Sequence, residues 1–146
     1  MFNNILVVCI GNICRSPTAE RALQQLIPGK KVSSAGIATE KSRLVGKSAD
    51  SMAIEIAGRN QLDVSGHSAR QLTQEMCRDN DLILVMEKKH IDAVSDIAPA
   101  ARGKTLLLGQ WLNQTEIPDP YRQSEEAFEH VFSLIEQSVQ QWSKKL

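Results

Sequence analysis

The chain contains three short runs made almost entirely of apolar residues: ILVVC at 5–9, LILVM at 82–86 and TLLLG at 105–109. Such runs are typical of parallel strands that helices cover on both faces of a sheet. A fourth strand is predicted for KVSSA at 31–35. Apolar residues with helical spacing lie between and after the strands, over 17–27, 50–60, 73–79, 88–97 and 124–145. This alternation predicts an α/β fold with a small parallel sheet.

Charge and cysteine content narrow the class of protein. The 17 basic and 17 acidic residues of this 146-residue chain cancel, which argues against binding nucleic acid or a membrane surface through bulk charge. No apolar run is long enough for a membrane span, and MFNNILVVC lacks the basic start of a signal peptide. Three cysteines are too few for a disulfide framework or a four-cysteine zinc site. We therefore expect one cytoplasmic domain over residues 1–146 with no metal.

The segment CIGNICRSP at 9–17 carries the strongest chemical signal. Cys9 ends the first strand and a helix begins near Ser16, at the sheet edge where parallel α/β proteins bind ligands. Gly11 and Asn12 tolerate a left-handed backbone between them. A tight loop above a helix N-terminus can aim its N–H groups inward and bind an anion. We predict a phosphate-binding loop made of Ile10, Gly11, Asn12, Ile13, Cys14, Arg15 and Ser16.

Cys9 and Arg15 suit this loop to phosphoryl transfer. The guanidinium group of Arg15 offers planar, paired donors for phosphate oxygens. The helix N-terminus and this cation favour the thiolate of Cys9, and the Ser16 hydroxyl can donate a hydrogen bond to the sulfur. A strand-end cysteine in the core and a solvent-facing arginine are the alternative interpretation. The combination Cys-x5-Arg-Ser between a strand and a helix favours a nucleophile at the centre of an oxyanion site.

A proton donor is predicted at Asp119. A phosphate ester releases its alcohol or phenol more readily when an acid faces the same crevice. In EIPDPYRQS at 116–124, Pro118 and Pro120 flank Asp119, and each proline restricts its own φ and the residue before it. The loop is therefore stiff and presents one carboxyl group beside Tyr121. An ordinary turn before the last helix is the alternative interpretation.

Together these motifs resemble the low-molecular-weight protein tyrosine phosphatases, particularly the bacterial members associated with capsule and exopolysaccharide production. The resemblance covers essentially the whole chain. It rests on VVCIGNICRSPTAE at 7–20, SAG at 34–36, GHSARQL at 66–72, DLILVMEKKH at 81–90 and IPDPYR at 117–122. It implies a three-layer fold with a four-stranded parallel sheet flanked by helices, and no cofactor. It also implies a phosphotyrosine-protein phosphatase whose partner is a bacterial tyrosine autokinase; a monomer is our default expectation.

The resemblance assigns catalytic roles by position. Cys9 would form a phosphocysteine intermediate, and Arg15 would hold the phosphoryl oxygens. Asp119 would protonate the leaving phenolate and then activate water for the second step. Ser16 would form a hydrogen bond to the thiolate or the leaving sulfur.

Supporting and substrate-contact roles follow in the same way. Asn12 would hold the shape of the loop, with Ser34 and His67 behind it. A hydrogen-bonded structural histidine is the plainer interpretation of His67 and is compatible with that role. The entrance to the site would lie near 43–45, and the substrate ring would contact Ile10, Leu44 and Tyr121.

The two remaining cysteines have different expected roles. By resemblance, Cys14 could form a reversible disulfide with Cys9 and protect it from irreversible oxidation. The alternative, a small side chain that fills space within the loop, is equally open. Cys77 lies in a helical stretch and is expected to pack in the interior.

Three other functions compete with the phosphotyrosine phosphatase. An arsenate reductase would share the loop but passes a disulfide along later cysteines, and residues 78–95 contain none. Phosphoarginine phosphatases resemble a version with threonine in place of Ile13, so the apolar Ile13 favours phosphotyrosine. A non-enzymatic phosphotyrosine-binding module would need neither the nucleophile nor the acid.

Overall fold

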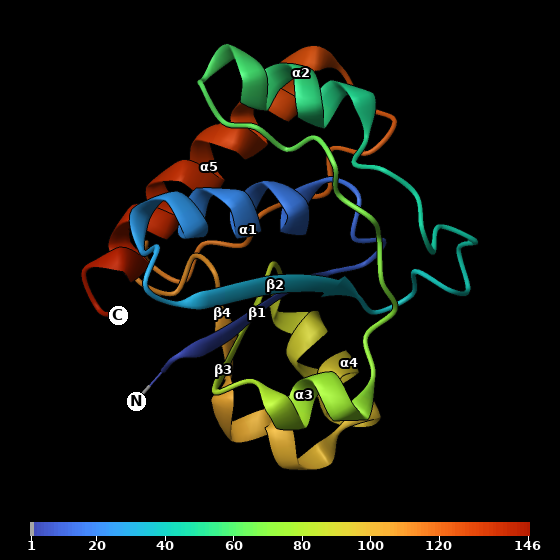
Figure 1. Cartoon of the computed structure of the whole chain (residues 1–146), viewed down its shortest axis with the longest axis vertical. Coiled ribbons are helices and arrows are strands. Elements are labelled where there is room, and N and C mark those ends of the chain that lie inside the picture. Colours follow the sequence, from blue (N-terminus) through green and yellow to red (C-terminus); the bar gives the residue numbers. More distant parts are fainter. Residues whose placement is uncertain (1) are drawn as a thin grey trace.

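A four-stranded parallel sheet forms the centre of the computed structural model, which describes residues 2–146 (Figure 1). The strand order is β2-β1-β3-β4. The strands are β1 (Asn4–Cys9), β2 (Lys31–Gly36), β3 (Leu82–Val85) and β4 (Thr105–Leu107). The predicted α/β fold and all four strands are confirmed, although β3 and β4 end earlier than their apolar runs. The run at 105–109 is cut short because Gly109 turns out of the sheet and pairs with Thr115.

Five helices flank the sheet: α1 (Arg15–Leu26), α2 (Ser51–Arg59), α3 (Gln74–Asp79), α4 (Lys88–Ile97) and α5 (Glu125–Ser143). Figure 1 shows α1, α2 and α5 on one side of the sheet and α3 and α4 on the other. The side chains of Asp50, Thr73 and Ser124 cap α2, α3 and α5 by accepting backbone N–H groups. A short 3₁₀-helix, Pro99–Lys104, follows α4 and was not predicted from the sequence.

Strand β1 divides the core because successive side chains of a strand point to opposite faces. Ile5, Val7 and Cys9 belong to the cluster that includes residues of α1 and α5. Leu6 and Val8 belong to the cluster that includes residues of α3 and α4. Cys9 is therefore on the α1 face of the sheet, beside the loop that leads into α1.

The carboxyl ends of the parallel strands meet at one edge of the sheet. The four segments that follow the strands therefore all begin at this edge. Parallel sheets bind their ligands at this edge. Within residues 2–146, no helix is both long enough and apolar enough to cross a bilayer.

Candidate functional site

The backbone carbonyl groups of the loop after β1 all have hydrogen-bond donors outside the loop. In order from residue 9 to residue 14, the donors are the N–H groups of Ile37 and Ala38, the Thr39 hydroxyl, the His67 ring, the N–H of Asp50 and the Thr18 hydroxyl. A trans peptide unit points its N–H away from its C=O. The carbonyls face the surrounding protein, so the loop is arranged to turn N–H groups toward its own centre. This arrangement binds anions.

Asn12 holds the loop together from within. Its φ of 61° is left-handed, a conformation that asparagine tolerates better than most residues. Its side-chain Nδ2 donates to the hydroxyl groups of Ser16 at 2.7 Å and Ser34 at 2.9 Å, and its Oδ1 accepts the N–H of Arg70 at 2.9 Å. Asn12 is completely buried, so each of these contacts replaces one that water would otherwise make.

Gly11 does not use the left-handed backbone that its residue type tolerates. Among residues 2–146 the only glycines with positive φ are Gly46 and Gly66. A Cβ at Gly11 would lie 2.9 Å from Cδ1 of Leu44, the end of a flexible side chain that can move aside. Gly36, at the end of β2, is more crowded. A Cβ there would lie 2.0 Å from the Thr39 hydroxyl oxygen and 2.6 Å from the carbonyl oxygen of Ile10.

A short chain of hydrogen bonds orients the Ser16 hydroxyl toward Cys9. The Ser16 Oγ lies 3.0 Å from the Cys9 sulfur and accepts the Asn12 amide. Ser34 also accepts that amide, and donates its own hydrogen to the Glu20 carboxylate at 2.6 Å. With its oxygen occupied by Asn12, Ser16 has its hydrogen available for the sulfur. The N–H of Asn12 adds a second donor 3.3 Å from the same sulfur.

His67 supports the loop from the 66–72 segment. Its Nε2 lies 2.7 Å from the Asn12 carbonyl oxygen, so Nε2 carries the hydrogen and donates it. Burial lowers the pKa of His67 below its ordinary value, and the hydrogen bond to Asn12 opposes that shift. His67 is therefore a neutral donor at pH 7. Ser34 and His67 therefore both contact Asn12 from outside the loop.

Arg15 is the first residue of α1 and is only 1% exposed. Its Nη1 donates to the Glu87 carboxylate at 2.8 Å and to the Ile117 carbonyl oxygen at 2.8 Å, and its Nη2 lies 3.8 Å from Asp119. Its Nε is buried without a hydrogen-bond partner in the part of the chain that the structure describes. Buried donors are normally paired, so an unpaired guanidinium N–H beside the loop indicates an anionic ligand.

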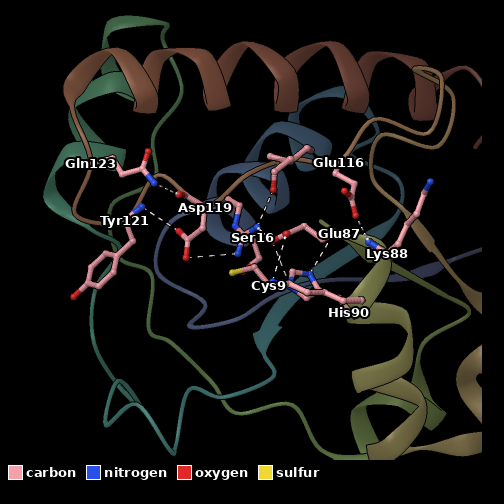
Figure 2. A network of polar contacts seen from close by, with 12 residues as sticks. Cys9, Ser16, Glu87, Lys88, His90, Glu116, Asp119, Tyr121 and Gln123 are labelled. Carbon is pink, nitrogen blue, oxygen red and sulfur yellow. Dashed lines mark hydrogen bonds and ion pairs between the residues drawn. The ribbon is translucent and has the colours of Figure 1, made fainter.

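Glu87 caps α4 beside His90 (Figure 2) and also binds Arg15. Its carboxylate accepts the backbone N–H of His90, and its own N–H donates to Nδ1 of His90. Partial burial alone would raise the pKa of Glu87, but the hydrogen bond and charge of Arg15 outweigh burial and lower it. Burial, with the nearby charge of Arg15, lowers the pKa of His90 to about 4. Glu87 is thus a carboxylate and His90 a neutral ring at pH 7.

Asp119 extends from a segment that is fixed at Ile117. Ile117 is fully buried, and its N–H donates to the Met86 carbonyl at 2.9 Å. The Asp119 side chain is 46% exposed, and its Oδ1 accepts the N–H of Tyr121 at 3.0 Å. Its other oxygen faces Nη2 of Arg15. The structure thus places Asp119 beside the loop after β1.

These segments surround a cavity of about 340 Å³. The predicted substrate-contact residues Ile10, Leu44 and Tyr121 all line it, together with Ser42 and Arg122, which were not predicted. The Arg122 guanidinium carbon lies 5.3 Å from the centre of the Tyr121 ring, a cation–π arrangement. From the loop after β1, the lining residues are Cys9, Ile10, Gly11, Ile13, Cys14 and Arg15.

All three cysteines are buried free thiols. Burial, followed by the nearby Asp50 carboxylate, raises the pKa of Cys14. Burial also raises the pKa of Cys77, which lies on α3 and packs against the sheet. Residues 2–146 contain no group of three or more histidine, cysteine or acidic side chains that could hold a metal ion.

Three residues near the site, Glu87, His90 and Glu116, were not predicted from the sequence. The position of Glu87 could have marked it as a candidate site residue, because it lies just beyond β3, at the edge where the strand ends meet. Its contact with Arg15 joins residues 72 positions apart, so only the folded chain shows it. Glu116 lay inside the segment recognised for its prolines, but nothing local indicated a role for its side chain.

A cysteine at the centre of an oxyanion-binding loop, with an arginine and a facing acid, defines a cysteine-dependent phosphatase site. Residues 4–146 match the family model described as "Low molecular weight phosphotyrosine protein phosphatase". The chain belongs to that family.

Individual relatives agree with this assignment. The low molecular weight protein-tyrosine-phosphatase Wzb of Escherichia coli K12 is 56% identical over 146 residues, which cover 100% of this chain and 97% of that protein. The structure of Vibrio vulnificus Wzb in complex with benzylphosphonate is 62% identical, covers 100% of both chains and gives a TM-score of 0.99. The YwlE arginine phosphatase, at 24% identity over 97% of this chain and 94% of its own, has a TM-score of 0.85, a likeness in fold alone.

Proposed function

We propose that this protein hydrolyses phosphotyrosine in other proteins through a phosphocysteine intermediate on Cys9. The observation that carries the proposal is the loop after β1, whose carbonyls all face outward around a buried cysteine. The unpaired Nε of Arg15 adds a cationic donor to that loop. The identity to named tyrosine phosphatases supports the same reaction.

In the first step, the Cys9 thiolate attacks phosphorus while the bond from phosphorus to the phenol oxygen breaks. The loop N–H groups and Arg15 stabilise the three non-bridging oxygens, where negative charge is spread in the transition state. Asp119 gives its proton to the departing phenolate. The product is a phosphocysteine, and Asp119 is left as a carboxylate.

In the second step, a water molecule attacks the phosphorus of the phosphocysteine. Asp119 takes a proton from that water, and the bond from sulfur to phosphorus breaks. The electron pair returns to the Cys9 sulfur, which the Ser16 hydroxyl stabilises at 3.0 Å. Inorganic phosphate leaves, and both residues regain their starting protonation states.

The cavity favours an aryl phosphate. Ile10, Leu44 and Tyr121 supply apolar and aromatic contacts for a phenyl ring above the loop. The apolar Ile13, which also lines the cavity, offers no polar partner for the guanidinium of phosphoarginine. Both features support phosphotyrosine over the phosphoarginine alternative.

Finer parts of the proposal rest on the sequence resemblance. The partner would be a tyrosine autokinase of bacterial polysaccharide export, met in the cytoplasm by a monomeric, single-domain enzyme. Cys14 would form a protective disulfide with Cys9 after oxidation. The raised pKa of Cys14 keeps it a thiol at pH 7, so this closure would be slow.

Phosphate release from matched phosphotyrosine, phosphoserine and phosphoarginine peptides tests the proposal, without added metal. We expect release from phosphotyrosine alone, and none from the Cys9→Ser variant. Release mainly from phosphoarginine would contradict the argument from Ile13. Absence of release from every peptide would contradict the phosphatase assignment, and arsenate with a thiol reductant would then be assayed.

A further inference from the structure

Two carboxylates bind the N-terminus of α4, and only one of them belongs to that helix (Figure 2). Glu87 caps the helix and holds Arg15. Glu116, from the segment after β4, accepts the backbone N–H of Lys88 at 2.8 Å. We propose that Glu116 is a positioning residue for Asp119, because its bond to α4 fixes the segment that carries the acid. This inference rests on the proposed function, in which Asp119 moves the proton.

The contacts of the segment show where it is held. Glu116 is tied to Lys88 by its side chain, and Ile117 is tied to Met86 by its N–H and to Arg15 by its carbonyl. These three hydrogen bonds attach residues 116 and 117 to the same edge of the sheet. Only Pro118 lies between them and Asp119, and its ring restricts φ. The position of the acid therefore follows from the position of residues 116 and 117.

Asp119 has few contacts that would keep it in place independently. Its carboxylate is 46% exposed, lies 3.8 Å from Arg15 and accepts one N–H from its own turn, that of Tyr121. On the far side, the Gln123 amide donates to the Asp119 carbonyl at 3.1 Å, a contact between exposed residues. Pro120, the next residue, is buried and holds the far side of the turn by packing, whereas the hydrogen bonds to the sheet edge all come from residues 116 and 117.

The simplest competing interpretation is that Glu116 only caps α4. The helix already has a complete capping box, formed by Glu87 and His90. Glu116 comes from 28 residues further along the chain and is exposed, so its contribution to the helix itself is small. The contact between Glu116 and Lys88 therefore contributes more to the position of residues 116–119 than to the stability of α4.

A leaving-group comparison separates the two interpretations. A phosphotyrosine peptide needs protonation of its phenolate, whereas an aryl phosphate with a very acidic phenol hardly needs it. A displacement of a catalytic group by about 1 Å costs up to 10²-fold in rate. We expect Glu116→Ala to lower kcat for the peptide about tenfold and for the activated aryl phosphate less than about threefold. Glu116→Gln, which keeps an acceptor oxygen for Lys88, should restore most of the peptide rate.

The same substitution in an Asp119→Ala background gives the decisive measurement. If Glu116 acts through Asp119, Glu116→Ala causes no further loss of peptide kcat there. A loss that multiplies with that of Asp119→Ala, or an equal loss for both leaving groups, would overturn the proposal. So would an unchanged peptide rate in Glu116→Ala. The matched control is Glu136→Ala, an exposed glutamate on α5, which should leave both rates unchanged.

Failure of this inference and failure of the proposed function are distinguishable. An unmodified protein that does not hydrolyse the phosphotyrosine peptide would contradict the function before any variant is made. An active protein whose Glu116→Ala variant fails the leaving-group test would contradict only the positioning role. Equal thermal unfolding midpoints for Glu116→Ala and Glu136→Ala would show that rate changes do not come from unfolding.

Discussion

Replacing Glu87 with alanine tests how strongly the fold holds its buried arginine. Arg15 is 1% exposed, and Nη1 has two partners at 2.8 Å, the Glu87 carboxylate and the Ile117 carbonyl. After the substitution, the nearest carboxylate within the described residues is Asp119, at 3.8 Å from Nη2. The guanidinium charge would then be buried with weaker compensation.

The size of the effect follows from these contacts. Removing one partner of a fully buried ion pair costs about 3–5 kcal/mol. Glu87 is 22% exposed, so water can replace part of the contact, and we take about 2 kcal/mol for this loss. Loss of the helix cap adds about 1 kcal/mol. We expect Glu87→Ala to lower the free energy of unfolding by about 3 kcal/mol, and Glu87→Gln, which keeps an acceptor oxygen, by about 1 kcal/mol.

Urea unfolding measures these values, and inhibition by inorganic phosphate measures the effect on the loop. We expect weaker phosphate inhibition in Glu87→Ala, because Arg15 would no longer be held beside the loop. Asp92→Ala is the control, since it removes an exposed ion pair with Arg102 from the same helix and should cost less than about 1 kcal/mol. If Glu87→Ala costs no more than this control, the argument from burial is wrong.

Three further substitutions test other parts of the site. Asp119→Ala should slow phosphotyrosine peptide hydrolysis by about 10²–10⁴-fold and matter less for activated leaving groups, and an equal loss for all esters would make Asp119 structural. The pKa of His90 is held at about 4, below the 6.5 of an unfolded histidine, so the unfolded chain binds more protons between these values. The contribution of His90 to stability should therefore fall by up to about 3 kcal/mol as pH drops from 6.5 to 4, and His90→Gln should make the pH dependence shallower in urea titrations at several pH values. Gly36→Ala should lower both stability, by about 1–3 kcal/mol in thermal or urea unfolding, and activity, because its Cβ would overlap Thr39; a fully active variant would refute that reading.

Local patterns in the sequence were sufficient to predict the strands and helices of the fold. Unbroken apolar runs identify parallel strands because both faces of each strand are covered, and this holds for β1 and β3 without knowledge of their neighbours. Cys9 and Arg15 lie close enough in sequence for a strand, a loop and a helix start to place them together. The prolines around Asp119 likewise act on their own backbone.

Contacts between residues far apart in the sequence could not be predicted from local patterns. The N–H of Arg70 orients the amide of Asn12 across 58 residues, and the carbonyl of Ile117 holds Arg15 across 102 residues. The backbone at residues 11 and 12 shows the same limit. Residue type alone allowed a left-handed backbone at residues 11 and 12, but the side-chain contacts that require it at Asn12 come from elsewhere in the fold.

The outward-facing carbonyls of the loop after β1 also give the site a spectroscopic signature. The N–H groups of Gly11, Ile13 and Cys14 donate no hydrogen bond within the described residues, so their protons should exchange with solvent quickly in the free protein. An oxyanion at the centre of the loop would accept those protons and slow their exchange, while the amides that donate to the loop carbonyls, such as that of Ala38, should be slow in both states. Exchange rates across this one loop would therefore report occupancy of the site residue by residue, without any turnover.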